Sequence, residues 1–305
     1  MQRWNRSGNL AITEVVAQPF MKMVVLTIGM ITVMWWRNLV IRAILTVFLL
    51  GGLQELSKAA STEHLTALQG TDYHLVHSKV VDHDYHVFVK VPETEKSEKL
   101  PVVYLLDGGN LFPMLTPYAR YLNIFDEVPP VIMVGISYGT SDWRQGNMRS
   151  RDYTLPAKRR EHYGGAEKFH QFLTQELIPM IEKKYPADPK QRILLGHSIG
   201  GQFALYCAMF QPQTFTGLIA SNPAIHRNTD LFLKPLELSS HHPKLFIMQA
   251  DKDDDQFKKP RQQWLDYWRD KPHHWQQQVM TAKDHNHMSS VPVAFRRGLM
   301  WLFQP

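Results

Sequence analysis

A serine flanked by glycines is the first place where this sequence could do chemistry. Residues 196–200 read GHSIG, which is the spacing G-x-S-x-G around Ser198. The apolar run 193–195 precedes it, and an amphipathic helical pattern follows over 202–210. A sharp turn between a buried strand and a helix lifts such a serine hydroxyl clear of the sheet. The pattern therefore predicts that Ser198 is a nucleophile. It also predicts that Ile199, at the helix start, offers its backbone N–H to an oxyanion.

A serine nucleophile needs a base within hydrogen-bond reach and a third group that orients the base. In this architecture the acid follows the serine along the chain, and the histidine follows the acid. Asp253 is the predicted acid, because it comes shortly after the apolar run 244–250, and Asp251 is the alternative. The base is expected in a late loop before the last helix, where His287 and His285 lie. Chain order does not separate these two, and we favour His287.

A second oxyanion donor is expected from the loop after an early strand. Residues 107–110 read DGGN, and the predicted strand 101–107 ends in this stretch. Gly109 is the predicted donor, because a glycine lets a substrate approach the backbone closely. Asn110 beside it is a candidate substrate-binding residue. A plain glycine turn is the alternative interpretation of this stretch.

Substrate contacts are also expected from the long polar stretch 137–163, which separates two predicted strands. A loop of this length in a compact domain is usually functional or mobile, and it could form a wall of the active-site pocket. Arg149 and Arg151 within it are candidate substrate-binding residues for an anionic ligand. A solvated surface loop explains both arginines equally well.

Apolar runs that alternate with helical patterns indicate the fold class. Strands are predicted at 85–91, 101–107, 130–136, 193–195, 216–221, 244–250 and 275–281, and helices at 111–122, 165–184, 202–210 and 293–303. Strands separated by helices are typical of an α/β protein with a mostly parallel, doubly wound sheet and helices on both faces. One such domain is expected over 71–305.

Composition excludes several other classes. The chain has 305 residues, 44% of them hydrophobic and 20% charged, which is ordinary for a globular domain. The net charge of +6 is mild, and the densest basic cluster, residues 158–160, is followed directly by Glu161, so we expect no nucleic-acid partner. The single cysteine, Cys207, rules out an internal disulfide. No metal-binding spacing is present, and the predicted chemistry needs no cofactor.

The first 60 residues form a predicted N-terminal extension. Residues 23–53 are strongly apolar but contain Arg37 and Arg42, which are costly in the core of a bilayer. We favour a secretory signal peptide, with 43–52 as its apolar region and small residues at 57–59 for cleavage. A membrane anchor is the alternative, with membrane association through 23–53. Either interpretation predicts a catalytic domain outside the cytoplasm, whether periplasmic, secreted or membrane-anchored.

Four stretches together resemble the putative-esterase branch of the α/β-hydrolases, which includes siderophore-lactone esterases and S-formylglutathione hydrolases. They are VYLLDG at 103–108, RDYT at 151–154, GHSIGG at 196–201 and HMSSVP at 287–292. The resemblance covers about 85–303, implies an α/β-hydrolase fold, and supports His287, since the family's histidine leads an H-x-S-x-x-P stretch. The family's acid often follows a glycine by three residues, and here Ala250 replaces that glycine before Asp253. Some siderophore esterases of this type work with a serine–histidine dyad, so the role of Asp253 stays open.

The resulting hypothesis is a serine esterase that cleaves a small-molecule carboxylic ester, with a siderophore lactone as the candidate substrate. An acyltransferase that uses the same residues is an alternative. A catalytically inactive binding protein on the same scaffold is another.

Overall fold

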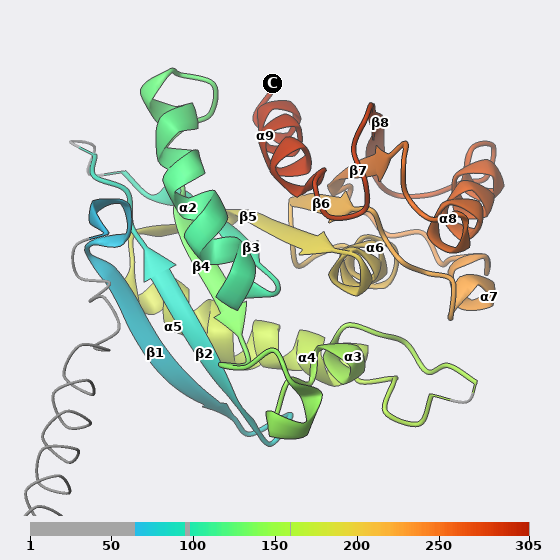
Figure 1. Ribbon diagram of the computed structural model, residues 1–305, viewed down its shortest axis with the longest axis horizontal. Helices are drawn as coiled ribbons and strands as arrows, with labels where there is room; N and C mark the ends of the chain where they lie inside the picture. The colour runs from blue at the N-terminus through green and yellow to red at the C-terminus, as the bar shows by residue number, and fades with distance from the viewer. Residues whose placement is uncertain (1–64, 95–97, 159, 305) are drawn as a thin grey trace, which may run out of the picture. The chain divides into compact units, whose positions relative to one another are not determined.

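A single mixed sheet organises the part of the chain that the computed structural model describes, residues 65–94, 98–158 and 160–304. These residues belong to one compact unit, Glu63–Pro305. Its strands run in the order β1-β2-β4-β3-β5-β6-β7-β8 (Figure 1). The pairs β1/β2 and β2/β4 are antiparallel, and every later pair is parallel.

The strands are β1 (Thr71–Ser78), β2 (His83–Lys90), β3 (Leu100–Leu105), β4 (Ile132–Ser137), β5 (Ala187–His197), β6 (Gly217–Ser221), β7 (Lys244–Ala250) and β8 (Gln276–Ala282). The helices are α2 (Gly108–Ile124), α3 (Arg149–Asp152), α4 (Ala166–Phe172), α5 (Ile178–Lys184), α6 (Ile199–Phe210), α7 (Thr229–Phe232), α8 (Asp255–Trp268) and α9 (Val291–Leu302). Shorter helical turns are η2 (Thr66–Leu68), η3 (Trp143–Gln145) and η4 (Leu173–Leu177).

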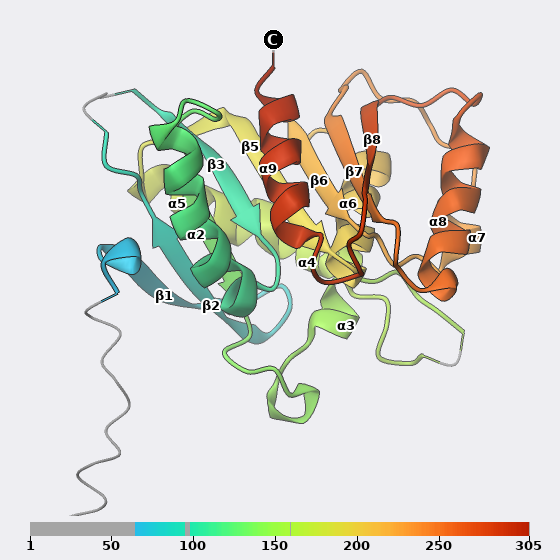
Figure 2. The ribbon, with the colours of Figure 1, turned by 45° about the horizontal axis from the view of Figure 1, so that its top comes forward.

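Helices cover both faces of the sheet. Figures 1 and 2 show α2 and α9 on one face and α4, α5 and α6 on the other. The central strands are apolar at successive positions because alternate side chains enter different cores. In β5, Ile193 and Leu195 pack in the core under α2 and α9, whereas Leu194 packs in the larger core on the other face. The predicted fold class, an α/β domain with a mostly parallel sheet and helices on both faces, is confirmed.

Several details differ from the sequence-based prediction: helix α8 was not predicted, and β5 begins at Ala187, before the predicted strand 193–195. The edge strand β1 was not predicted, because its residues are mostly exposed or half-buried and its sequence TDYHLVHS carries no clear apolar alternation. The helix predicted over 165–184 forms as α4, the π-helical turn η4 and α5 in succession. Pro179 lies at the start of α5, and its missing N–H interrupts regular helical hydrogen bonding at this point.

The predicted N-terminal extension, residues 1–60, and the apolar segment 23–53 lie outside the described residues. Within the described part of the chain, no helix is both long enough and apolar enough to cross a membrane.

Candidate active site

The turn between β5 and α6 carries Ser198 in an unusual backbone conformation. Ser198 has φ 58° and ψ −118°, a region that residues with a side chain rarely adopt. Such conformations persist where the surrounding structure enforces them, and they cluster at functional sites. A Cβ atom on Gly196 would lie 2.0 Å from the carbonyl oxygen of Gly200, so the turn is closed too tightly for any residue but glycine at 196. The turn is further held by the backbone N–H of Ser198, which donates to Ser221 O at 2.9 Å.

Asp253 and His287 meet at the same edge of the sheet. Asp253 follows β7, His287 precedes α9, and His287 Nδ1 lies 2.9 Å from Asp253 Oδ1. The Asp253 side chain is fully buried and also accepts from Arg261 Nη1 at 3.1 Å and from the N–H of Asp254 at 2.8 Å. Because a carboxylate only accepts hydrogen bonds, Nδ1 carries the proton and Nε2 is left to accept one. His287 Nε2 is buried, with no hydrogen-bond partner among the described residues.

Aromatic side chains surround the His287 ring. Its centroid lies 4.7 Å from that of His197, the direct neighbour of Ser198, and the Phe257 ring stacks on it at 4.7 Å and 25°. In the described part of the chain, no hydrogen bond joins the Ser198 hydroxyl to His287. Hydrogen bonds of this kind are often long in ligand-free enzymes and shorten when substrate binds.

The two alternative residues have other partners. The Asp251 carboxylate accepts the backbone N–H groups of Asp284 at 2.9 Å and His285 at 3.1 Å. His285 Nδ1 lies 3.0 Å from the carbonyl oxygen of Ser289. Both side chains thus stabilise the loop before α9, and it is Asp253 that the structure brings to His287.

His197 is a buried neutral residue. The residue is 5% exposed, and its Nδ1 lies 3.2 Å from Ser221 Oγ. Burial, together with the positive charge that His287 and Arg149 can carry, lowers the pKa of His197 to about 3. His197 is therefore uncharged at neutral pH.

Asn222 is a functional candidate that the sequence analysis missed. It lies at the end of β6 with φ 43°, fully buried. Its Nδ2 donates to His287 O at 2.8 Å and Ser290 Oγ at 2.6 Å, and its Oδ1 accepts from Ala250 N at 2.7 Å. One side chain therefore joins the loop of the histidine to the strand that carries the acid. Its position directly after a predicted strand was the signal that could have identified it.

A cleft of about 620 Å³ opens in front of Ser198. The stretch 137–163 supplies much of its wall, so the prediction that this loop borders the pocket is confirmed. Its lining residues are Phe88, Asp107, Gly109, Asn110, Leu111, Ser137, Tyr138, Gly139, Thr140, Ser141, Asn147, Arg149, His197, Ser198 and Met288. The predicted residues Gly109, Asn110 and Arg149 thus share one cleft with Ser198.

Arg151 does not belong to this set. Its Nε lies 2.6 Å from the fully buried carboxylate of Asp152, which also accepts from the hydroxyls of Tyr85 and Tyr138. Among the described residues that line the cleft, Arg151 is not found, and its guanidinium already serves as a structural partner of Asp152.

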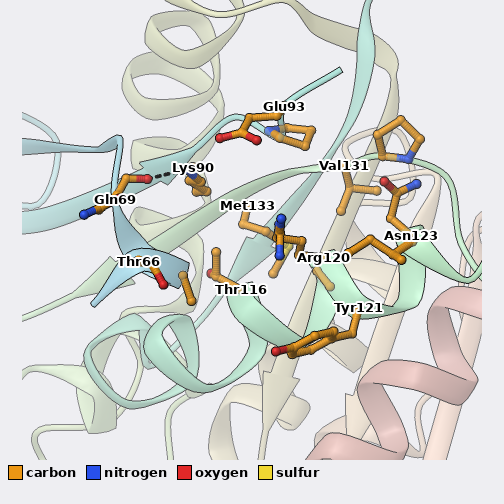
Figure 3. A pocket seen from close by; sticks show the side chains of 15 residues that line it. Thr66, Gln69, Lys90, Glu93, Thr116, Arg120, Tyr121, Asn123, Val131 and Met133 are labelled. Carbon is orange, nitrogen blue, oxygen red and sulfur yellow. Dashed lines mark hydrogen bonds between the residues drawn. The ribbon is translucent and has the colours of Figure 1, made fainter. Parts of the chain in front are cut away.

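A second hollow, of about 440 Å³, lies near the end of α2 and the start of β4 (Figure 3). Thr66, Thr116, Arg120, Tyr121 and Met133 contribute to it, and Lys90 beside them donates to the carbonyl oxygen of Gln69. None of the predicted catalytic residues contributes to this hollow, so the cleft at Ser198 is the candidate active site. In the described ranges, no group of three or more His, Cys, Asp or Glu side chains is placed to hold a metal ion.

Comparison with known proteins places the chain among esterases. The family described as "Putative esterase" matches residues 78–298, well over half of the chain. The ferri-bacillibactin esterase BesA of Bacillus subtilis is 32% identical over 188 residues, covering 57% of this chain and 65% of the relative. The apo-salmochelin esterase of Escherichia coli O6:H1 is 28% identical over 183 residues, covering 54% of this chain and 56% of the relative. The chain therefore spans less than two thirds of the length of these relatives.

A solved structure has the same fold. The crystal structure of the BES protein from Bacillus cereus matches with a TM-score of 0.65 at 22% sequence identity. The match covers 78% of this chain and 96% of that protein.

Proposed function

Since the chain belongs to the putative esterase family, we propose that it is a serine hydrolase that cleaves carboxylic esters. The observation that carries the proposal is the pairing of His287 with buried Asp253 at the sheet edge where Ser198 occupies its strained turn. A base with an oriented Nδ1–H and an unpartnered Nε2 is the group that a serine nucleophile needs.

The reaction proceeds through an acyl-enzyme. Ser198 Oγ attacks the ester carbonyl while His287 Nε2 accepts the hydroxyl proton, and the Asp253 carboxylate stabilises the imidazolium. The backbone N–H groups of Ile199 and Gly109 hold the negative oxygen of the tetrahedral intermediate. His287 then gives the proton to the leaving alcohol. A water, deprotonated by the same Nε2, releases the acid and restores Ser198.

The proposed substrate class is a siderophore ester. The support is that BesA and the apo-salmochelin esterase, both similar to this chain, are named for siderophores. The wall of the cleft also carries the side chains of Asn110 and Ser141, an amide and a hydroxyl that can hydrogen-bond a polar ligand.

Ester hydrolysis by purified protein tests the proposal. Wild type is expected to hydrolyse short p-nitrophenyl esters and siderophore lactones, with Ser198→Ala slower by several orders of magnitude. Ser240→Ala, an exposed serine outside the cleft, is the matched control and should retain wild-type rates. A fluorophosphonate probe should label Ser198. Equal rates in wild type and Ser198→Ala, or no labelling, would refute the proposal and favour an inactive binding protein.

The same assay separates hydrolysis from acyl transfer. Products are compared with and without an added alcohol acceptor. A dominant new ester in the presence of the acceptor would identify an acyltransferase, whereas free acid in both reactions supports the hydrolase.

We further propose, from the sequence of 23–53, that the catalytic domain acts outside the cytoplasm. This segment lies outside the described residues. N-terminal sequencing of the protein recovered from fractionated cells tests the proposal: a mature N-terminus after residue 53 supports a cleaved signal, and intact protein in the membrane fraction supports an anchor. Intact protein confined to the cytoplasm would contradict both.

A further inference from the structure

An ion pair lies inside the cleft, beside the proposed oxyanion site. Arg149 Nε lies 2.7 Å from Asp107 Oδ1, and Arg149 Nη2 lies 2.9 Å from Asp107 Oδ2. This is a bidentate guanidinium–carboxylate pair, the geometry that fixes both side chains most firmly. The Asp107 side chain is 16% exposed and that of Arg149 is 31% exposed. Burial disfavours the charged guanidinium, but the Asp107 carboxylate outweighs burial, and the pKa of Arg149 is raised.

The position of the Asp107 carboxylate is chemically unfavourable for the proposed reaction. A Cβ atom on Gly200 would lie 3.6 Å from Asp107 Oδ2, so the carboxylate borders the first turn of α6, where Ile199 offers its N–H. Asp107 also directly precedes α2 and lies two residues before Gly109, the other proposed oxyanion donor. A bare carboxylate here would repel the negative charge that develops on the substrate oxygen.

No other side chain in the cleft wall compensates this charge. Among the described residues that line the cleft, Asp107 is the acidic residue and Arg149 the basic one, and His197 is neutral. Arg151, on the same short helix α3 as Arg149, is paired with Asp152. Neutralisation of Asp107 therefore depends on Arg149.

The ion pair between Arg149 and Asp107 also fixes the backbone at the start of α2. Asp107 has φ 55°, in the left-handed region, and its backbone N–H donates to Tyr153 Oη at 3.3 Å. Arg149 passes over the ring of the same Tyr153 at 5.9 Å. Residues of the stretch 137–163 thus hold both the side chain and the backbone of Asp107. Because Gly109 lies two residues further on, these contacts also help to position its backbone N–H.

We propose that Arg149 is a charge-compensating and positioning residue, which neutralises Asp107 so that the oxyanion forms beside a neutral ion pair. This inference rests on the proposed serine-esterase function. It also changes the expected role of Arg149: the guanidinium is committed to Asp107 and is not a free receptor for an anionic substrate.

Four variants test the inference with a neutral p-nitrophenyl ester, and active sites are counted by fluorophosphonate labelling. Arg149→Met is expected to lower kcat about 100-fold while KM changes less than threefold, because an unpaired carboxylate opposes the transition state rather than substrate binding. Asp107→Asn combined with Arg149→Met should recover most of that loss. Asp107→Asn alone should keep kcat at least 30-fold above that of Arg149→Met. Arg151→Met is the control for losing an ion pair on α3; its thermal midpoint should fall while kcat stays within about threefold of wild type.

A purely structural ion pair gives a different pattern. In that case Asp107→Asn and Arg149→Met lower kcat equally, the double variant stays as slow as Arg149→Met, and the thermal midpoint follows kcat. Any of these results would overturn the inference while wild type remains active and Ser198→Ala inactive. If Arg149→Met does not fold, the kcat of Asp107→Asn decides the question. A kcat within about threefold of wild type, or above it, supports the inference, whereas a larger loss overturns it. Equal rates in wild type and Ser198→Ala would instead refute the proposed function.

Discussion

At the residue scale, the least certain assignment from sequence is that of the acid. Four aspartates follow β7 within five positions, and the spacing alone left Asp251 and Asp253 open. Their surroundings separate them. Asp251 lies on the surface and accepts backbone N–H groups, which lower its pKa, whereas the Asp253 carboxylate is fully buried between His287 and Arg261. A buried carboxylate persists only when it is paired and hydrogen-bonded, and His287 is one of its partners.

Asp253→Asn is expected to lower kcat by about 10³- to 10⁴-fold with little change in KM. The amide can donate to His287 Nδ1, which moves the ring proton to Nε2 and removes the base. Steady-state kinetics on a p-nitrophenyl ester measure the effect. Asp254→Asn is the matched control: Asp254 caps α8 by accepting from Gln256 N at 2.8 Å, and its replacement should leave kcat within about twofold. A loss of less than tenfold in Asp253→Asn would favour a serine–histidine dyad.

At the scale of elements, the site depends on the carboxyl ends of β5, β6 and β7, which lie side by side. These strands are parallel neighbours, so the residues after them meet at one edge of the sheet. Asn222, directly after β6, links the strand that precedes the proposed acid to the loop of the proposed base. Its side chain accepts a hydrogen bond from Ala250 N on β7 and donates one to His287 O before α9. The proposed triad is thus held by a buried side chain that has no chemical role of its own.

Asn222→Gly removes three hydrogen bonds but tolerates the positive φ of this position. We expect a loss of roughly 1–3 kcal/mol in the free energy of unfolding and a drop of about 10- to 100-fold in kcat, because the histidine loop is no longer fixed. Urea unfolding and steady-state kinetics measure the two effects.

Asn228→Gly is the matched control for Asn222→Gly. Asn228 is also buried, and its Nδ2 also donates to two acceptors, the carbonyl oxygens of Leu155 and Pro156. Its replacement should cost similar stability and leave kcat within about threefold. Equal losses of kcat in the two variants would show that general destabilisation, and not the placement of His287, explains the Asn222 effect.

At the scale of the whole molecule, buried neutral histidines make stability depend on pH. Burial lowers the pKa of His170 to about 4, and the pKa of His197 is about 3, whereas an unfolded histidine titrates near 6.5. Below pH 6.5 the unfolded chain therefore binds protons that the folded chain does not, and stability falls as pH falls. His74, His83, His226 and His273 also have lowered pKa values, so their contributions have the same sign.

Urea unfolding at pH 7 and pH 5 tests this dependence. His170 and His197 are each expected to contribute a loss of about 2 kcal/mol between these pH values, at about 1.4 kcal/mol per pH unit below 6.5. His170→Gln should make the pH dependence shallower by about that amount. A free energy of unfolding that is constant or rises from pH 7 to pH 5 would contradict the burial of neutral imidazoles.

The sequence by itself determined the fold class and the chain positions at which chemistry is possible. Apolar runs of strand length alternating with helical patterns are local signals, and GHSIG carries its own turn geometry, because only glycine at 196 leaves room for the carbonyl of Gly200. The edge strand β1 escaped prediction because a half-exposed strand lacks a strong apolar pattern. Order along the chain also limited the acid and base to a few candidates each.

Only the tertiary structure shows which of those candidates contact one another. The pairing of Asp253 with His287, the bridge through Asn222 and the commitment of Arg149 to Asp107 join residues 34, 65 and 42 positions apart along the chain. Such contacts depend on sheet order and on the path of long loops, which no local pattern encodes. Arg149 and Arg151 illustrate this: they lie two residues apart in one polar stretch, yet they pair with different carboxylates, and of the two Arg149 lines the cleft.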